Sequence, residues 1–264
     1  MLHAGFSIVA CMRRHLLDLI LFSTYAELRA ERSRSYLGLI WWVLEPAMMM
    51  LVFWLVFGVI LHNGGPDYVP FLLIGFTIWQ WIKSCITHAG YAIWSNLPLI
   101  RQAPLPPLMF ALVQMLADTV KFFFIFALLV VVLWFMGFPP NKAYLALIPL
   151  FIIVFIFSIG AGFVVAAVVP LIPDLRFVIE QFLTILMFLS GVIFSLDAVP
   201  PDLAQVLKWN PILELIEATR GILLRGEWPD LTTMIRVAIE SLTICALGIT
   251  MVQRLSPRYP KLAA

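Results

Sequence analysis

Long apolar stretches alternate with short polar segments along almost the whole chain. A helix needs about 20 apolar residues to cross a hydrocarbon core of about 30 Å. Stretches of this length lie at 38–61, 69–92, 107–136, 143–169, 175–195 and 232–253. Turn-forming residues such as Asn63-Gly64-Gly65-Pro66 separate them. The pattern predicts an all-α integral membrane protein with six transmembrane helices.

The composition agrees with this prediction. Hydrophobic residues make up 62% of the 264 residues and charged residues 12%, whereas soluble domains hold about half and a quarter. We therefore expect a single transmembrane domain over 1–264, without an added soluble catalytic domain. Cys11, Cys85 and Cys245 form no CxxC pair, and the 4 histidines are scattered. We expect no disulfide framework and no metal site.

The distribution of Lys and Arg gives an orientation, because cytoplasmic loops carry the excess of these residues. With the N-terminus inside, the outer segments hold only Lys142, Lys208, Arg220 and Arg225. The inner segments hold Arg13, Arg14, Arg29, Arg32, Arg34, Arg101, Arg176, Arg254, Arg258 and Lys261. We expect both termini to be cytoplasmic.

The segment 13–35 is too charged to span a membrane. Its apolar residues are mixed with charged residues, as in a helix that lies in the headgroup plane. The aromatic residues that follow it, Tyr36, Trp41 and Trp42, suit the interfacial belt. Two interpretations remain open at this point, a plain interfacial anchor or a moving gate.

The connection 196–231 contains two short helical patterns. Pro200-Pro201 opens the first, Asn210-Pro211 breaks it, and the second ends at Arg225-Gly226. Neither is long enough to span. Irregular backbone at membrane depth is tolerated only where protein or water surrounds it. The pattern indicates a re-entrant or interfacial hairpin on the outer side, or an ordinary outer loop with two surface helices.

Charged residues inside the apolar stretches are expected to face the interior of the helix bundle. They are Glu45, Lys83, Asp118, Lys121, Glu180, Arg236 and Glu240. At about 1.5 Å per residue, Lys83 lies at a depth similar to Asp118 and Lys121. We expect these three to form a network that neutralises charge between helices. A proton relay is disfavoured, because no histidine is expected among them.

Motifs of known enzymes are missing from the chain. It holds no G-x-x-x-x-G-K-[ST] phosphate loop, no G-x-S-x-G elbow and no H-E-x-x-H. A transporter or channel subunit is therefore favoured over an enzyme.

Several motifs together resemble one family. They are Ser33-x-Ser35-Tyr36-Leu37-Gly38-x-x-Trp41-Trp42-x-x-x-Pro46, Asn96-Leu97-Pro98-Leu99-Ile100-Arg101, Pro173-Asp174-Leu175-Arg176, and Val199-Pro200-Pro201 with Trp209-Asn210-Pro211. In order and spacing the chain resembles the permease subunits of type-2 ABC exporters for lipid-linked polysaccharides such as O-antigen, capsule and teichoic acid. The resemblance covers nearly the whole chain.

The resemblance implies a homodimer in the bacterial inner membrane, with two copies of a separate ATPase that binds ATP and magnesium. It assigns the segment 13–35 as a cytoplasmic gate helix, with Glu27, Arg29, Glu31, Arg32 and Arg34. The loop 94–104 would couple to the ATPase through Asn96, Leu97, Pro98, Leu99, Ile100 and Arg101. The segment 196–231 would be the outer gate, with Pro200, Pro201, Trp209, Asn210 and Pro211.

An aromatic lining suits a glycan channel, because sugars stack on aromatic faces while their hydroxyl groups bind polar groups. The candidates are Tyr36, Trp41, Trp42, Glu45, Phe53 and Trp54. Glu45 fits the inner mouth of a polar pathway or a charge that snorkels to the interface, and several of the aromatic residues could instead face lipid. Alternative functions are a drug or small-lipid exporter of the same architecture, and an intramembrane enzyme acting on a lipid-linked sugar.

Overall fold

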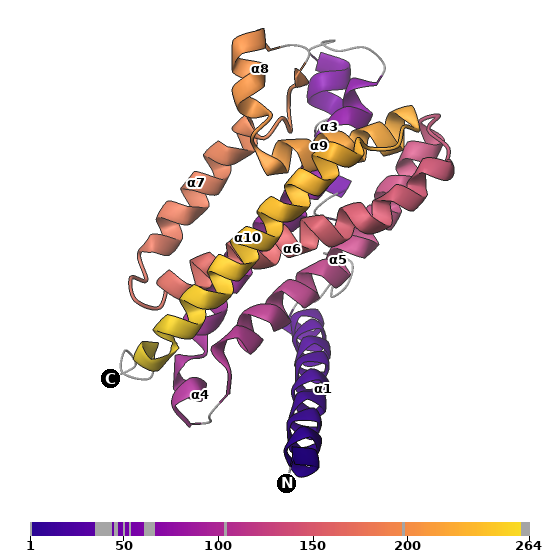
Figure 1. Ribbon diagram of the computed structural model, residues 1–264. Helices are drawn as coiled ribbons and strands as arrows, with labels where there is room; N and C mark the ends of the chain where they lie inside the picture. Colours follow the sequence, from indigo (N-terminus) through magenta and orange to yellow (C-terminus); the bar gives the residue numbers. More distant parts are fainter. Residues whose placement is uncertain are drawn as a thin grey trace.

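The computed structural model describes residues 2–34, 67–102, 105–196 and 199–259, together with 44, 47–49, 51, 52 and 54–60. Every regular element in these ranges is a helix (Figure 1). Part of the predicted stretch 38–61 is described, including the π-helix η1 (Trp54–Ile60). The described part of the chain is all-α, as predicted.

Four helical segments are long and apolar enough to cross a membrane among the described residues. They are α3 (Tyr68–Ser95), α5 (Pro107–Phe135), η2 (Lys142–Ala146) continued by α6 (Leu147–Val168), and α10 (Leu231–Leu255) continued by η5 (Ser256–Arg258). Their ends lie close to those of the predicted stretches. The chain is therefore a multi-pass membrane protein.

The starts of these helices follow from local chemistry. Pro107 occupies the first turn of α5, where its missing N–H leaves no donor unsatisfied. The side chain of Asn141 accepts a hydrogen bond of 2.8 Å from the Ala143 amide ahead of α6. Asp230 accepts one of 2.9 Å from the Thr233 amide at the start of α10. These caps satisfy backbone N–H groups that a first turn leaves without partners.

The helix α7 (Leu175–Leu189) has 15 residues and is shorter than the predicted stretch 175–195. At about 1.5 Å per residue it covers about 22 Å, less than the hydrocarbon core. It ends because the chain turns at Ser190 and Gly191, and Gly191 has a φ of 65° that only glycine adopts readily.

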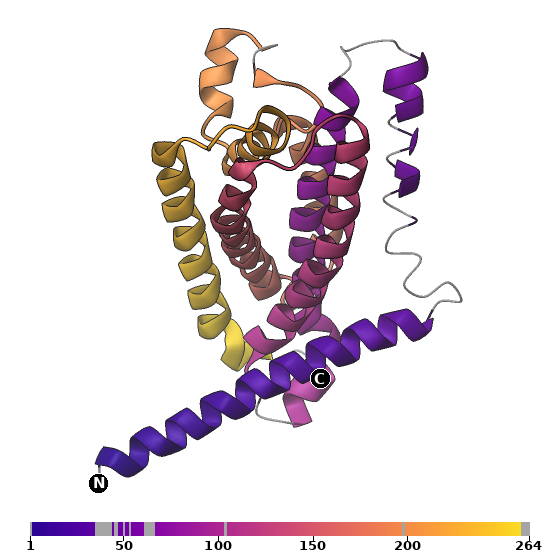
Figure 2. The ribbon, with the colours of Figure 1, turned by 90° about the vertical axis from the view of Figure 1, so that its right-hand side faces the viewer.

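The first helix, α1 (Leu2–Arg34), begins before the predicted start at residue 13. It lies across one end of the bundle and packs against α5 (Figure 2). Ile20 and Thr24, one turn apart, are buried in this contact, whereas Phe22 and Tyr25 are exposed. The apolar outer face fits a helix that lies along a membrane surface.

The helices α6 and α10 are in close contact because glycines line their interface. A Cβ on Gly248 would lie 2.7 Å from the Gly160 carbonyl oxygen. Small residues permit such backbone contact between helices in lipid. Between α3, α5 and α6 the core is aromatic, with Trp81 stacked on Phe122 at 3.9 Å and Phe151 edge-on to both.

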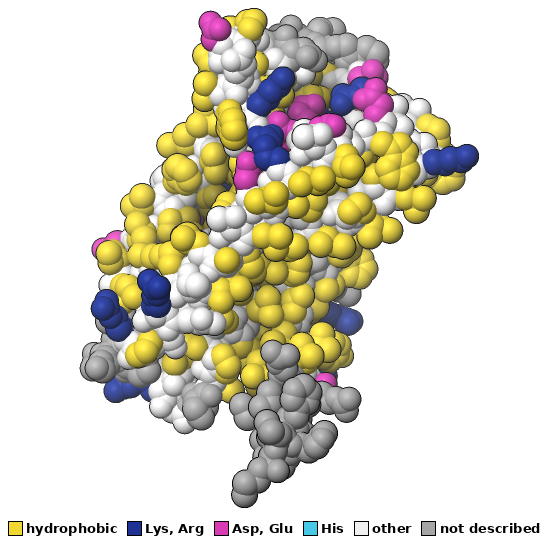
Figure 3. All heavy atoms as spheres, viewed as in Figure 1, with side chains coloured by type: hydrophobic (Ala, Val, Ile, Leu, Met, Phe, Trp, Pro, Cys, Tyr) yellow, Lys and Arg dark blue, Asp and Glu magenta, His cyan; other side chains and the backbone are white. Residues whose placement is uncertain are grey.

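The two ends of the bundle differ in their elements (Figure 1). The short helix α4 (Leu97–Gln102), α1 and the end of α10 lie at one end. At the other end lie α8 (Pro201–Leu207), α9 (Pro211–Arg220) and the π-helical turn η4 (Gly221–Arg225). Apolar side chains cover the surface between these ends, and most charges on the face drawn in Figure 3 gather near the ends.

Candidate functional site

The helix α4 joins α3 to α5 and presents one face outward. Leu97 and Ile100 are buried against the bundle, whereas Pro98, Leu99 and Arg101 are exposed. Asn96 fixes the turn before it, since its carbonyl accepts hydrogen bonds of 3.0 Å from the amides of Leu99 and Ile100. The predicted coupling residues thus form a short helix that is held by two side chains and open on its other face.

The chain also places its described C-terminal segment at this end. Tyr259 is fully buried, and its hydroxyl donates a 3.1 Å hydrogen bond to the Ala167 carbonyl in the last turn of α6. Burial raises the pKa of the Tyr259 hydroxyl to about 12, so the group stays protonated at neutral pH. This bond satisfies a carbonyl that a helix end leaves without a backbone partner.

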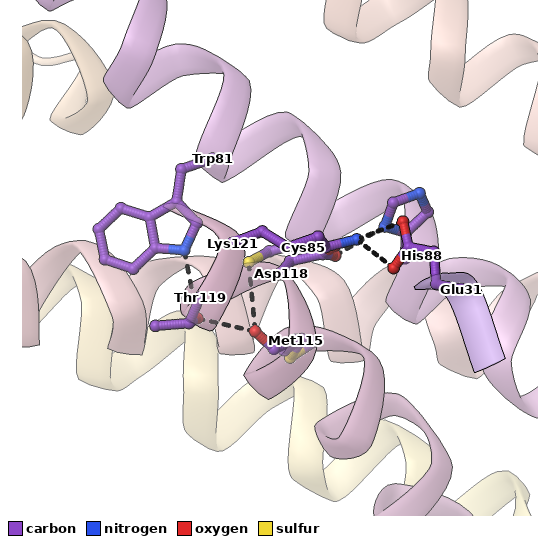
Figure 4. A network of polar contacts seen from close by, with 8 residues as sticks. All are labelled: Glu31, Trp81, Cys85, His88, Met115, Asp118, Thr119 and Lys121. Atoms are coloured by element: carbon purple, nitrogen blue, oxygen red, sulfur yellow. Dashed lines mark hydrogen bonds and ion pairs between the residues drawn. The ribbon is translucent and has the colours of Figure 1, made fainter. Parts of the chain in front are cut away.

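Four charged or titratable side chains from three helices meet where α1 crosses α5 (Figure 4). Lys121 of α5 lies 2.9 Å from the Asp118 carboxylate and 3.1 Å from that of Glu31 in α1. His88 Nδ1 of α3 lies 2.7 Å from the other Asp118 oxygen. The Asp118 carboxylate is therefore paired on both oxygens. We call Glu31, His88, Asp118 and Lys121 the inner charge cluster.

The predicted network is corrected in one member. Asp118 and Lys121 pair as expected, but Lys83 forms no ion pair within the described residues, and His88 and Glu31 complete the cluster. Lys83 and His88 are five residues apart, which separates them by about 140° around a helix. The expectation that no histidine joins these charges is wrong. Trp81, Cys85 and His88 recur at helical spacing and all contact α5. This spacing is the feature of the sequence that places His88 on the same face as the contacts with α5.

Polar contacts connect α3 and α5 beside the inner charge cluster (Figure 4). Trp81 Nε1 of α3 donates a 3.2 Å hydrogen bond to the Thr119 hydroxyl of α5, which donates one of 2.7 Å to the Met115 carbonyl. The buried Cys85 thiol also faces that carbonyl, at 3.9 Å. These contacts hold α3 and α5 to one another at the depth of the cluster.

The first turns of α7 pack against the last turns of α3. The Tyr91 hydroxyl donates a hydrogen bond to the Glu180 carboxylate. The Arg176 guanidinium lies over the rings of Trp94 and Phe177, at 5.2 and 4.5 Å from their centroids. The residues around the Pro173-Asp174-Leu175-Arg176 motif therefore attach α7 to the part of α3 that leads into α4.

At the opposite end, prolines begin both short helices. Pro201 and Pro211 occupy the first turns of α8 and α9. The Asn210 side chain accepts a 3.0 Å hydrogen bond from the Ile212 amide and donates one of 3.1 Å to the Ser190 hydroxyl. Asn210 thus connects α9 to the end of α7. Pro200 and Trp209 are exposed.

Arg220, at the end of α9, is completely buried. Its guanidinium donates hydrogen bonds of 2.7 to 3.1 Å to three carbonyls and one carboxylate, those of Phe71, Gly191, Val192 and Glu217. Its Cζ lies 3.3 Å from the centroid of the Phe71 ring. Burial lowers the pKa of Arg220 to about 10, so it remains charged at neutral pH. Arg220 joins α3, the turn after α7, and α9.

No motif in the sequence indicates this role, because Arg220 lies in the outer connection among other cations. Two neighbours make space for it. Gly75 lies against the guanidinium, where a Cβ would overlap it, and Gly191 supplies both a tight turn and an acceptor carbonyl.

A second arginine, Arg236 of α10, binds α9. It pairs with Glu214 at 3.0 Å and with Glu240 at 3.8 Å, and donates a 3.0 Å hydrogen bond to the Lys208 carbonyl. Burial raises the pKa of the Glu214 carboxyl, and Arg236 opposes this rise. Arg236 and Glu240 lie four residues apart on α10, and Glu214 of α9 is the nearer of the two carboxylates.

The other predicted site residues are placed only in part. Tyr36, Trp41, Trp42, Glu45 and Phe53 lie outside the described residues. Trp54 lies in η1 and is 52% exposed. Of the predicted gate helix residues, Arg29 and Arg32 are exposed, Glu27 is half-buried, and only the backbone of Arg34 is described.

These features are those of a multi-pass membrane protein with bonded polar contacts at both ends. The chain belongs to the ABC-2 type transporter family, whose family model matches residues 19–224.

Three relatives illustrate the similarity. The chain is 22% identical over 213 residues to the O-antigen export system permease protein RfbA of Klebsiella pneumoniae, covering 80% of this chain and 82% of that protein. It is 25% identical to the polysialic acid transport protein KpsM of Escherichia coli, covering 85% and 88%. It is 24% identical to the capsule polysaccharide export inner-membrane protein CtrC of Neisseria meningitidis, covering 87% and 88%.

Members of this family are permeases that work with a separate ABC ATPase subunit. The chain is accordingly a transport subunit and not an enzyme.

Proposed function

We propose that this chain is the membrane-spanning subunit of an ATP-driven exporter that moves a lipid-linked polysaccharide, of O-antigen or capsule type, across the bacterial inner membrane from the cytoplasmic side. Two copies would form the pathway, each crossing the membrane six times. Two copies of a separate ATPase would bind ATP and magnesium. The polysaccharide substrate is supported by the names of the relatives, which are exporters of O-antigen and capsule glycans.

The observation that carries the proposal is that α4, in a chain of this family, has one buried face and one exposed face. Two buried side chains hold it against the bundle and the chain connects it to α3 and α5, while Pro98, Leu99 and Arg101 are exposed. A partner that binds this face therefore acts on both helices at once. We assign α4 as the coupling helix that binds the ATPase.

The end that holds α4 is assigned to the cytoplasm. Arg101, Arg254 and Arg258 are exposed there, and cytoplasmic segments are rich in such residues. Both described ends of the chain lie on this side (Figure 2), which supports cytoplasmic termini. On this assignment α1 is the cytoplasmic gate helix, and α8 and α9 are the outer gate on the far side.

The test is a charge reversal on α4, Arg101→Glu, in cells that also make the ATPase subunit. We expect at least about tenfold weaker ATPase binding, equivalent to about 1.4 kcal/mol, together with loss of surface glycan. Arg254→Glu is the matched control, because it makes the same charge change at the same end but on α10. Equal ATPase recovery with both variants would remove the α4 assignment. An unmodified complex that is intact but exports no glycan would instead remove the proposed substrate.

A further inference from the structure

We propose that the inner charge cluster is the link through which α1 follows α3 and α5, and that Glu31 and Lys121 are positioning residues for the gate helix. This inference rests on the proposed function, since it assumes that α4 receives the movement of the ATPase. It concerns a different step, which is how that movement reaches α1. This helix is not a neighbour of α4 along the sequence.

The cluster lies on the two helices that α4 connects. His88 precedes the end of α3 by seven residues, about 10 Å of helix, and Lys121 follows the start of α5 by 14 residues, about 21 Å. The contacts from Trp81 to Thr119 and from Cys85 to the Met115 carbonyl tie α3 and α5 together at this level. A displacement of α4 therefore reaches the cluster through two helices that move together.

The contact between α1 and α5 has two parts with different properties. Ile20 and Thr24 provide burial, which is non-directional and permits sliding. Glu31 provides direction, because both of its carboxylate oxygens lie within 3.2 Å of Lys121 Nζ. Charge-assisted bonds of this kind fix geometry as well as contributing energy. Glu31 lies in the last turn of α1, beside the segment that leads to the first span.

Lys121 is itself held in place. Its other partner, Asp118, has a side chain that is only 3% exposed and is also bound by His88. If Lys121 moved away with α1, the buried Asp118 carboxylate would lose one of its two partners and keep only His88, which is unfavourable for a buried charge. When α5 moves, Lys121 therefore stays with Asp118 and carries Glu31 along. The link is firm on the α5 side and breaks at Glu31, whose side chain is 41% exposed.

The test uses the intact complex with the ATPase subunit, in membranes that supply the lipid-linked glycan. Glu31→Gln removes the charge that Lys121 binds and keeps nearly the same shape. Asp18→Asn is the matched control, an equivalent change at an exposed position of the same helix. Export per molecule and ATP hydrolysis are measured on the same preparations.

We expect Glu31→Gln to lower export by about fivefold or more, the lower end of typical coupling between linked sites. ATP hydrolysis should persist, so that more ATP is used for each glycan exported. Glu31→Asp, which keeps the charge, should recover part of the export. Asp18→Asn should match the unmodified protein.

Two results would overturn the link. One is equal export per molecule by Glu31→Gln and Asp18→Asn. The other is a parallel loss of export and ATP hydrolysis in Glu31→Gln, which indicates a general structural defect. Failure of the proposed function has a separate signature, since the unmodified complex would then show no ATP-dependent export at all.

Discussion

The strongest stability prediction concerns Arg220, and the change is Arg220→Met. Methionine is similar in length and fits an apolar site, but it donates no hydrogen bond. The carbonyls of Phe71, Gly191 and Val192 would lose their donor, and Glu217 would lose its cation. Because the side chain is fully buried, water cannot replace the lost bonds without opening the contact.

The size of the effect follows from these losses. Each buried acceptor without a partner costs about 1–3 kcal/mol, and breaking a buried ion pair on one side costs about 3–5 kcal/mol. The two estimates describe overlapping groups, so they are not added. We expect a loss of about 4 kcal/mol, or roughly three powers of ten in the folding equilibrium constant.

Thermal unfolding of the purified protein in detergent measures this loss. We expect the midpoint to fall on the order of 10 °C for Arg220→Met. Arg225→Met is the control, because Arg225 lies five residues later and its pair with Glu227 is exposed, at 52% and 63%. Exposed pairs contribute about 0–1 kcal/mol. If the two variants unfolded at the same temperature, Arg220 would not be the connection described here.

Two further changes test contacts made by α6. Gly248→Ala should destabilise the protein by about 1–3 kcal/mol, because the new Cβ meets the Gly160 carbonyl of α6, which cannot shift without moving that helix. The control is Ala246→Val at an exposed position of α10. Equal thermal unfolding midpoints for these two variants would contradict the close packing of α6 and α10. Tyr259→Phe should lower the free energy of unfolding by about 1–3 kcal/mol, since the Ala167 carbonyl loses its donor. Tyr25→Phe, at an exposed position, is the control. Limited proteolysis should cleave the C-terminal segment of Tyr259→Phe earlier than that of the control.

Four of the six predicted membrane helices are found among the described residues. In lipid every backbone group must be bonded within the helix, so apolar length is the dominant signal. Turn residues such as Asn141 and Pro107 then set their ends. The prediction is less accurate where apolar length is not decisive. The start of α1 and the end of α7 depend on packing and on the φ of Gly191, and neither produces a break in hydrophobicity.

The polar contacts are harder to predict for a similar reason. Asp118 and Lys121 are neighbours on one helix, and their pairing follows from spacing alone. The partners from other helices do not. Glu31 reaches Lys121 only because α1 crosses α5 at that level, and Arg220 binds mainly backbone carbonyls, which carry no side-chain signal. Charges that act between helices are therefore found from the packed arrangement and not from the residue pattern.

The inner charge cluster and the contacts of Arg220 both include residues of α3. Phe71 binds Arg220 near the start of α3 and His88 binds Asp118 17 residues later, a separation of about 25 Å. Between them the helix is continuous, and it is the most buried of the four membrane helices. A buried, unbroken helix shifts or tilts as a unit more readily than it bends, because bending needs a break in its hydrogen bonds. A displacement of α3 would therefore move the inner charge cluster and the contacts of Arg220 together.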